Sequence, residues 1–87
     1  MFTPAQLRAA RALLGWSQQD LAKASGVHIN SINAFENGLS DPKQSTLIKL
    51  RGTLFRAGII FIDADSIAGT GAGVKFMWID PKNPPKD

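Results

Sequence analysis

The chain has 87 residues, which predicts one small domain, because compact domains usually take about 100 to 200 residues. Its composition, 44% hydrophobic and 20% charged, is typical of an ordinary folded domain. The sequence has no cysteine, which excludes disulfides, thiolate metal sites and a cysteine nucleophile, and its single histidine leaves little for acid–base chemistry. We therefore expect no enzymatic activity, no cofactor and no metal ion.

Ten basic and seven acidic side chains give a formal net charge of +3, a mild excess that favours a polyanionic partner. No apolar run approaches the roughly 20 residues that cross a bilayer. The first residues also lack the charged start and apolar stretch of a secretion signal. We expect a cytoplasmic protein without membrane contact.

The first helix is expected to begin at Pro4, because Thr3 is a favoured N-cap and Gln6 completes a capping box. An apolar stripe with helical spacing follows and ends at Gly15. Arg11 lies on this stripe, where an unpaired guanidinium is costly. The pattern therefore predicts a carboxylate partner from another element.

Two further short helices follow directly. Ser17 is an N-cap with Asp20 three residues later, and this helix ends at Gly26. The next helix is expected over about 29–37, closed by Gly38. Two short helices joined by a short turn containing glycine are typical of a helix-turn-helix.

The third helix has an outer face rich in carboxamides. Helical spacing places Ile32 and Phe35 on its inner side. The outer side carries Ile29, Asn30, Asn33, Ala34 and Asn37. Asparagine is a poor helix former, but its amide can pair with N6 and N7 of adenine in the major groove. This face is a candidate for reading bases.

Residues 15–38 have the sequence GWSQQDLAKASGVHINSINAFENG, which closely resembles the DNA-binding helix-turn-helix of the Xre/Cro family of phage and bacterial repressors. The resemblance extends over about residues 5–57. The positions shared with the family are Gln18, Leu21, Ala22, Gly26, Val27, Ile32, Glu36, Asn37 and Gly38. It implies a sequence-specific transcriptional regulator that binds double-stranded DNA and reads the major groove with the helix at about 28–37.

The expected roles of individual residues follow. Base contacts are expected from Ile29, Asn30, Asn33 and Ala34, and phosphate contacts from Gln18, His28, Asn37 and Lys43. For His28, a capping or surface role is the alternative. The resemblance also implies that Glu36 is the partner of Arg11, in a structural ion pair that ties the first helix to the third.

One feature departs from the family. Residues 27–37 include no lysine or arginine, although these residues supply most phosphate and guanine contacts in such proteins. An alternative function follows, in which the same helical domain binds another transcription factor rather than DNA.

A fourth helix is expected over about 44–57, with three leucines on one face, and Gly52 within it is interpreted as a close approach of another helix. Residues 59–63 and 74–79 are short, apolar and bounded by turn residues, so we expect a β-hairpin. The predicted fold is mainly α. It comprises a four-helix, repressor-like domain (1–58), a hairpin (59–79) and a disordered tail (80–87).

Residues 59–62 are apolar on both faces of the predicted strand, which exceeds what one hairpin on a helical body can bury. The surplus predicts a homodimer. Its interface is expected at Ile60, Ile62, Met77 and Ile79.

Three other patterns have simpler interpretations. Asp63 and Asp65 are read as solvated carboxylates rather than as a metal-binding pair. The glycines at 69, 71 and 73 imitate a phosphate-binding loop, but they precede a strand, whereas such loops open a helix. Trp16 and Trp78 are expected to pack in the core rather than to stack on bases.

Overall fold

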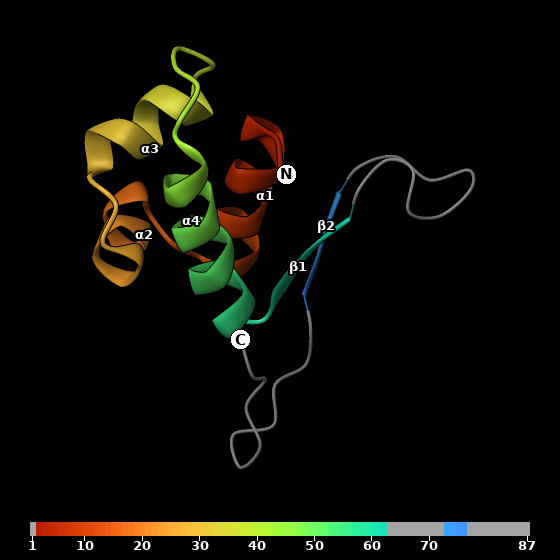
Figure 1. Ribbon diagram of the computed structural model, residues 1–87. Coiled ribbons are helices and arrows are strands. Elements are labelled where there is room, and N and C mark those ends of the chain that lie inside the picture. Colours follow the sequence, from red (N-terminus) through yellow and green to blue (C-terminus); the bar gives the residue numbers. More distant parts are fainter. Residues whose placement is uncertain (1, 63–72, 77–87) are drawn as a thin grey trace.

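The computed structural model describes residues 2–62 and 73–76. Four helices are followed by two antiparallel strands (Figure 1). These elements are α1 (Pro4–Leu14), α2 (Gln18–Ser25), α3 (Ile29–Glu36), α4 (Gln44–Arg56), β1 (Ile59–Ile62) and β2 (Gly73–Phe76). The mainly helical fold with a C-terminal hairpin, expected from the sequence, is confirmed.

The first two helices begin at the expected capping boxes. The Thr3 hydroxyl accepts from the Gln6 backbone N–H at 3.2 Å, and Gln6 Oε1 accepts from the Thr3 N–H at 2.8 Å. Ser17 and Asp20 exchange the same two bonds at 3.0 and 2.9 Å. Gly15, with φ of 68°, ends α1 in the left-handed conformation that glycine adopts without strain. These local bonds fix where α1 and α2 lie in the sequence.

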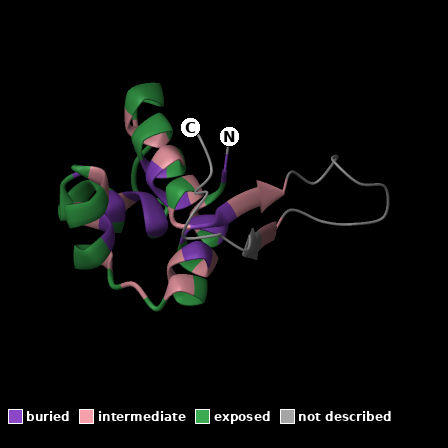
Figure 2. Cartoon of the chain, turned by 90° about the horizontal axis from the view of Figure 1, so that it is seen from below, coloured by how far each residue is buried: buried purple, intermediate pink, exposed green. Residues whose placement is uncertain are grey.

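The core lies between the four helices and is continuous with the hairpin, as the inward purple segments of Figure 2 show. Its largest fully buried side chains are Leu7, Leu21, Ile32, Leu50, Leu54 and Ile59. Helix α1 packs against α3 and β2, α2 packs against α3 and α4, and α4 packs against β1. The helix-turn-helix is therefore held from behind by α1 and α4.

A cluster of aromatic rings joins the helical body to the hairpin. Phe2 is buried and meets Phe35 of α3 edge to face, with ring centroids 5.8 Å apart. On its other side it stacks on Phe61 of β1, with centroids 4.5 Å apart. Trp16 packs partly buried against the core, as expected. Trp78 lies outside the described residues.

Gln6 anchors the hairpin to α1 as well as capping the helix. The strands pair in the register Ile59↔Phe76 to Ile62↔Gly73. The buried Gln6 side chain donates from Nε2 to the carbonyl oxygens of Ile62, at 3.0 Å, and Gly73, at 2.8 Å. One amide therefore holds both strands at the pair nearest the connecting segment.

Two expectations need correction. The second strand, β2, begins at Gly73 rather than at residue 74, whereas β1 is described over Ile59–Ile62. The region of the hairpin containing residues 63–72 and the expected strand residues 77–79 lie outside the described residues. The prediction that another helix approaches Gly52 closely is wrong, because among the described residues a Cβ there would meet only guanidinium atoms of Arg56, at 3.6 and 3.9 Å.

Candidate nucleic-acid interface

Helix α3 is anchored by two apolar side chains and presents a neutral outer face. Ile32 and Phe35 are buried, as the helical spacing predicted. The residues that the sequence assigned to base contact lie on the opposite side, where Asn30 and Asn33 are exposed and Ala34 is half-buried. Ile29 is 36% exposed at the first turn. The structure thus brings the four candidate base-reading residues together on one face.

His28 caps the N-terminus of α3. Its Nδ1 accepts from the Asn30 backbone N–H at 3.0 Å. Since Nδ1 is the acceptor, a neutral His28 ring carries its proton on Nε2, which leaves a donor on the exposed side. The capping alternative is therefore observed, and the ring can cap the helix and still donate to a phosphate.

Arg11 and Glu36 form a bidentate ion pair between α1 and α3. Arg11 Nε donates to Glu36 Oε2 and Arg11 Nη2 to Glu36 Oε1, both at 2.7 Å, and Nη1 donates to the Trp16 carbonyl at 3.0 Å. The Glu36 side chain is 2% exposed and that of Arg11 is 19% exposed. These hydrogen bonds raise the pKa of Arg11 above its ordinary value, so the guanidinium stays charged at any physiological pH. The pair fixes the C-terminal end of α3 against α1.

Gln18 and Asn37, both expected to contact phosphates, already form side-chain hydrogen bonds within the protein. Gln18 Nε2 donates to Glu36 Oε1 at 3.1 Å, and Gln18 Oε1 accepts from Asn33 Nδ2 at 3.2 Å. Asn37 follows α3 as its C-cap, and its Nδ2 donates to Asn33 Oδ1 at 3.2 Å. The sequence pattern gave no indication of the two Gln18 bonds, because they depend on how α2 lies against α3, whereas the Asn37–Asn33 bond joins residues four apart.

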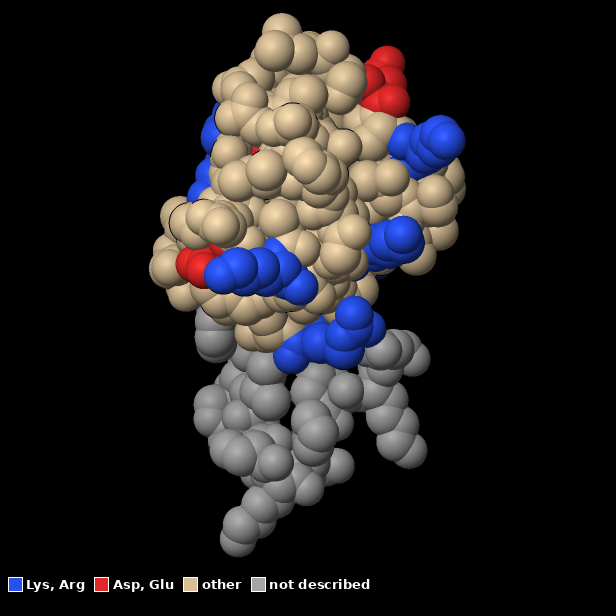
Figure 3. Space-filling model, turned by 90° about the vertical axis from the view of Figure 1, so that its left-hand side faces the viewer, with Lys and Arg blue, Asp and Glu red and all other residues tan. Residues whose placement is uncertain are grey.

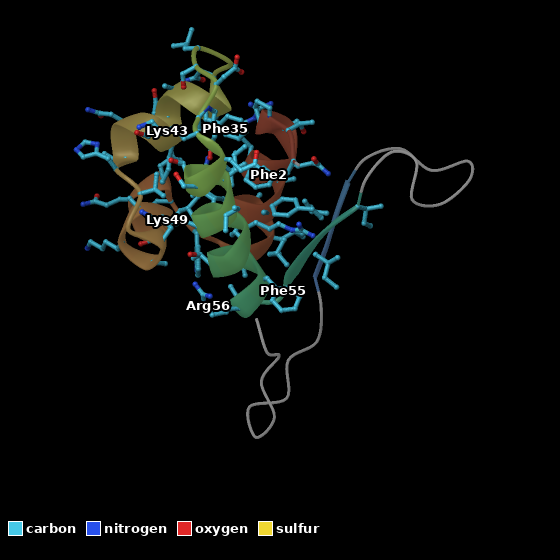
Figure 4. The ribbon with its side chains drawn as sticks, viewed as in Figure 1. Phe2, Phe35, Lys43, Lys49, Phe55 and Arg56 are labelled. Atoms are coloured by element: carbon cyan, nitrogen blue, oxygen red, sulfur yellow. The ribbon has the colours of Figure 1, made fainter. Side chains whose placement is uncertain are left out.

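Positive charge surrounds the outer face of α3 rather than lying on it. Figure 3 shows an upper region that is almost uncharged, with Lys and Arg side chains at its sides and below and with acidic side chains beside them at the upper right and lower left. Lys43 is the exposed N-cap of α4, and Lys49 and Arg56 follow along the same helix (Figure 4). Arg8, for which the sequence pattern indicated no role, donates from Nη1 to the carbonyl of Glu36 at the end of α3. A cation there is favoured by the helix dipole.

The described residues include no group of three or more His, Asp or Glu side chains that could hold a metal ion. Within the same residues, no helix combines the length and apolar character needed to span a bilayer.

The order of the helices, the glycine-containing turn between α2 and α3 and the exposed face of α3 define a helix-turn-helix domain. A helix-turn-helix family model matches residues 7–55, from α1 to the last turn of α4. The chain belongs to this Xre/Cro-like family of DNA-binding transcription regulators. No curated protein matches the chain.

Proposed function

We propose that this protein is a sequence-specific transcriptional regulator that binds double-stranded DNA and places α3 in the major groove. The single observation that supports this most strongly is the row of exposed side chains on α3, with Ile29, Asn30 and Asn33 on a helix whose other side is fixed in the core. Asparagine can bond N6 and N7 of adenine, and an apolar side chain can contact a thymine methyl. Ala34 lies at the margin of the same face.

Phosphate contacts in this mode come from the surroundings of α3. His28 offers its Nε2 donor at the helix N-terminus, and Lys43 lies exposed at the start of α4. Gln18 and Asn37 can still each offer one amide hydrogen that the bonds described above do not use. Backbone N–H groups at helix N-termini add further donors.

The test is selection from a random duplex library, followed by equilibrium binding to the selected sequence. We expect one preferred sequence, and Asn30→Ala or Asn33→Ala should each lose about 1 to 3 kcal/mol at a single base pair. Ser31→Ala is the matched control, because Ser31 is exposed on α3 but lies outside the row. Replacing thymine by uracil at one position tests the Ile29 contact. If both asparagine variants keep the parent's sequence preference, the assignment of base contacts is wrong.

A second candidate function is a regulator that binds another transcription factor through the same helical domain. The observation that favours it is the neutral outer face of α3, because DNA readers usually place lysine or arginine there. Selection separates the two candidates. A protein-binding domain would enrich no duplex sequence.

The hairpin is proposed as the dimer contact, since two half-sites held about one helical turn apart give such domains their specific affinity. Ile60 and Ile62 lie on the strand face opposite the core residue Ile59, and both are half-buried. Met77 and Ile79, the other expected interface residues, lie outside the described residues. In Figure 1 β1 and β2 lie on the side of the helical body opposite α2 and α3.

Sedimentation of the Ile60→Lys variant tests the dimer. We expect a monomer with weaker DNA binding and an unchanged helical spectrum. Ile48→Lys is the matched control, because Ile48 is apolar, 57% exposed and located on α4. If Ile60→Lys sediments like the parent, the hairpin is not the interface.

A further inference from the structure

A continuous chain of side-chain hydrogen bonds runs from the buried ion pair to the exposed face of α3. It begins at Glu36 Oε1, which accepts from Arg11 and from Gln18 Nε2. It continues from Gln18 Oε1, which accepts from Asn33 Nδ2, to Asn33 Oδ1, which accepts from Asn37 Nδ2. This series of hydrogen bonds leads from Arg11 on α1 to Glu36 on α3, then to Gln18 on α2 and back to Asn33 on α3.

The direction of this chain is fixed at its buried end. A carboxylate only accepts hydrogen bonds, and both oxygens of Glu36 are held by the guanidinium of Arg11. Gln18 must therefore turn its NH₂ group toward Glu36, since the reverse orientation would set two oxygens against each other. Its oxygen then faces Asn33, so Asn33 must donate. Each amide takes its orientation from the one before it.

The orientation of Asn33 matters because A·T and T·A pairs show the same groups in opposite order. In the middle of the pair lie N6 of adenine, a donor, and O4 of thymine, an acceptor, and exchanging the strands reverses the order of these two groups. After its two bonds within the chain, Asn33 keeps one N–H on the side of Gln18 and one oxygen lone pair on the side of Asn37. An amide held this way matches one of the two pairs, whereas an amide free to turn matches both.

We propose that Gln18 is a positioning residue that holds the Asn33 amide in one orientation and thereby makes α3 distinguish A·T from T·A at the base pair facing Asn33. The inference rests on the proposed DNA-reading function. It gives Gln18 a role in addition to the phosphate contact expected from the sequence, and the orientation of both amides starts from the Glu36 carboxylate.

The decisive variant is Gln18→Lys. Lysine can still donate to Glu36 and can still reach a phosphate, but it has no oxygen to accept from Asn33. Gln18→Met removes both bonds at similar length and serves as the second variant. Thermal melts identify any variant that fails to fold, and Gln19→Lys is the matched control, because Gln19 is the exposed neighbour on α2.

Binding is measured on the selected duplex and on a copy with A·T and T·A exchanged at the position that responds to Asn33→Ala. The parent and Gln19→Lys should prefer one duplex by about tenfold, as 1 to 3 kcal/mol of discrimination implies. Gln18→Lys and Gln18→Met should bring the ratio close to one while leaving the preference at the Asn30 position intact. If Gln18→Lys changes the affinity for both duplexes equally, Gln18 contacts only phosphate and the inference is overturned.

A second measurement does not need DNA. In the free protein, NMR should show slower exchange with water for the side-chain amide protons of Asn33 than for those of Asn30, and Gln18→Lys should remove the difference. Equal rates in the parent would show that Gln18 does not hold Asn33. If instead the rates differ but no duplex is selected, the proposed DNA-reading function is wrong. The proposed base preference is then wrong as well, whereas the hydrogen bonds among Glu36, Gln18 and Asn33 are still supported.

Discussion

Replacing Arg11 by methionine removes the cation from a carboxylate that cannot reach water. Glu36 is 2% exposed and takes two bonds of 2.7 Å from Arg11, whereas Gln18 supplies only one longer bond. Removing one partner of a buried pair leaves an uncompensated charge, which costs about 3 to 5 kcal/mol. The free energy of unfolding of a small domain is about 5 to 15 kcal/mol in total. The variant should therefore have a melting temperature tens of degrees lower, or be only partly folded at room temperature.

The two partners are not equivalent. Arg11 is 19% exposed, so in Glu36→Gln the guanidinium can turn toward solvent and the loss should be smaller than in Arg11→Met. Arg11→Met combined with Glu36→Leu leaves no buried charge and should recover part of the stability lost by the single variant.

Urea unfolding followed by circular dichroism measures these free energies, and Arg51→Met is the matched control, because Arg51 is exposed on α4. A free energy of unfolding for Arg11→Met within about 0.5 kcal/mol of the parent would refute the burial argument, since surface substitutions usually stay in that range.

Gln6→Glu should lose about 1 to 3 kcal/mol in urea unfolding, because a carboxylate oxygen would face the carbonyls of Ile62 and Gly73. Burial raises the pKa of that introduced carboxyl in the folded state, so the loss should be smallest near pH 4 and grow toward pH 7; a loss independent of pH would contradict this. The backbone N–H of Ser17 lowers the pKa of Asp20, so the stability that Asp20 adds is present above its unfolded pKa of about 3.9 and is lost as the pH falls further. The difference in unfolding between the parent and Asp20→Asn should accordingly be constant from about pH 5 to 8 and shrink below pH 4. Gly52→Ala should gain about 0.5 to 1 kcal/mol, since within the described part of the chain the added Cβ meets only Arg56, at ordinary distance, and a loss of stability would show a packing constraint instead.

The helices could be placed from the sequence because their boundaries are set by local bonds. Thr3 with Gln6, and Ser17 with Asp20, are three residues apart and form the same capping pattern wherever the helix lies in the fold. Gly15 likewise acts on the turn that precedes it. Such features need no knowledge of tertiary structure.

The contacts that the sequence pattern missed join residues far apart in the chain. Gln6 donates to residues 56 and 67 positions later, and neither spacing nor periodicity indicates such bonds. The partner of Arg11 came from the family resemblance, because the helical stripe predicted only some carboxylate. Gly52 was misread because a helical glycine carries no information on what lies beside it, and here the neighbour is a flexible side chain of the same helix.

In the proposed binding mode, affinity and sequence preference come from different parts of the surface. The outer face of α3 has no charged side chain, so its amides add little to the release of counterions that dominates affinity. Lys43 lies at the rim, where a phosphate contact strengthens binding to every sequence alike. The amide of Asn33 instead discriminates by the order of its donor and acceptor, which is fixed through Gln18 by a carboxylate buried behind the helix. Glu36 therefore connects the stability of the domain to the base preference of its surface, since the carboxylate that pairs with Arg11 also orients the amides that face the DNA.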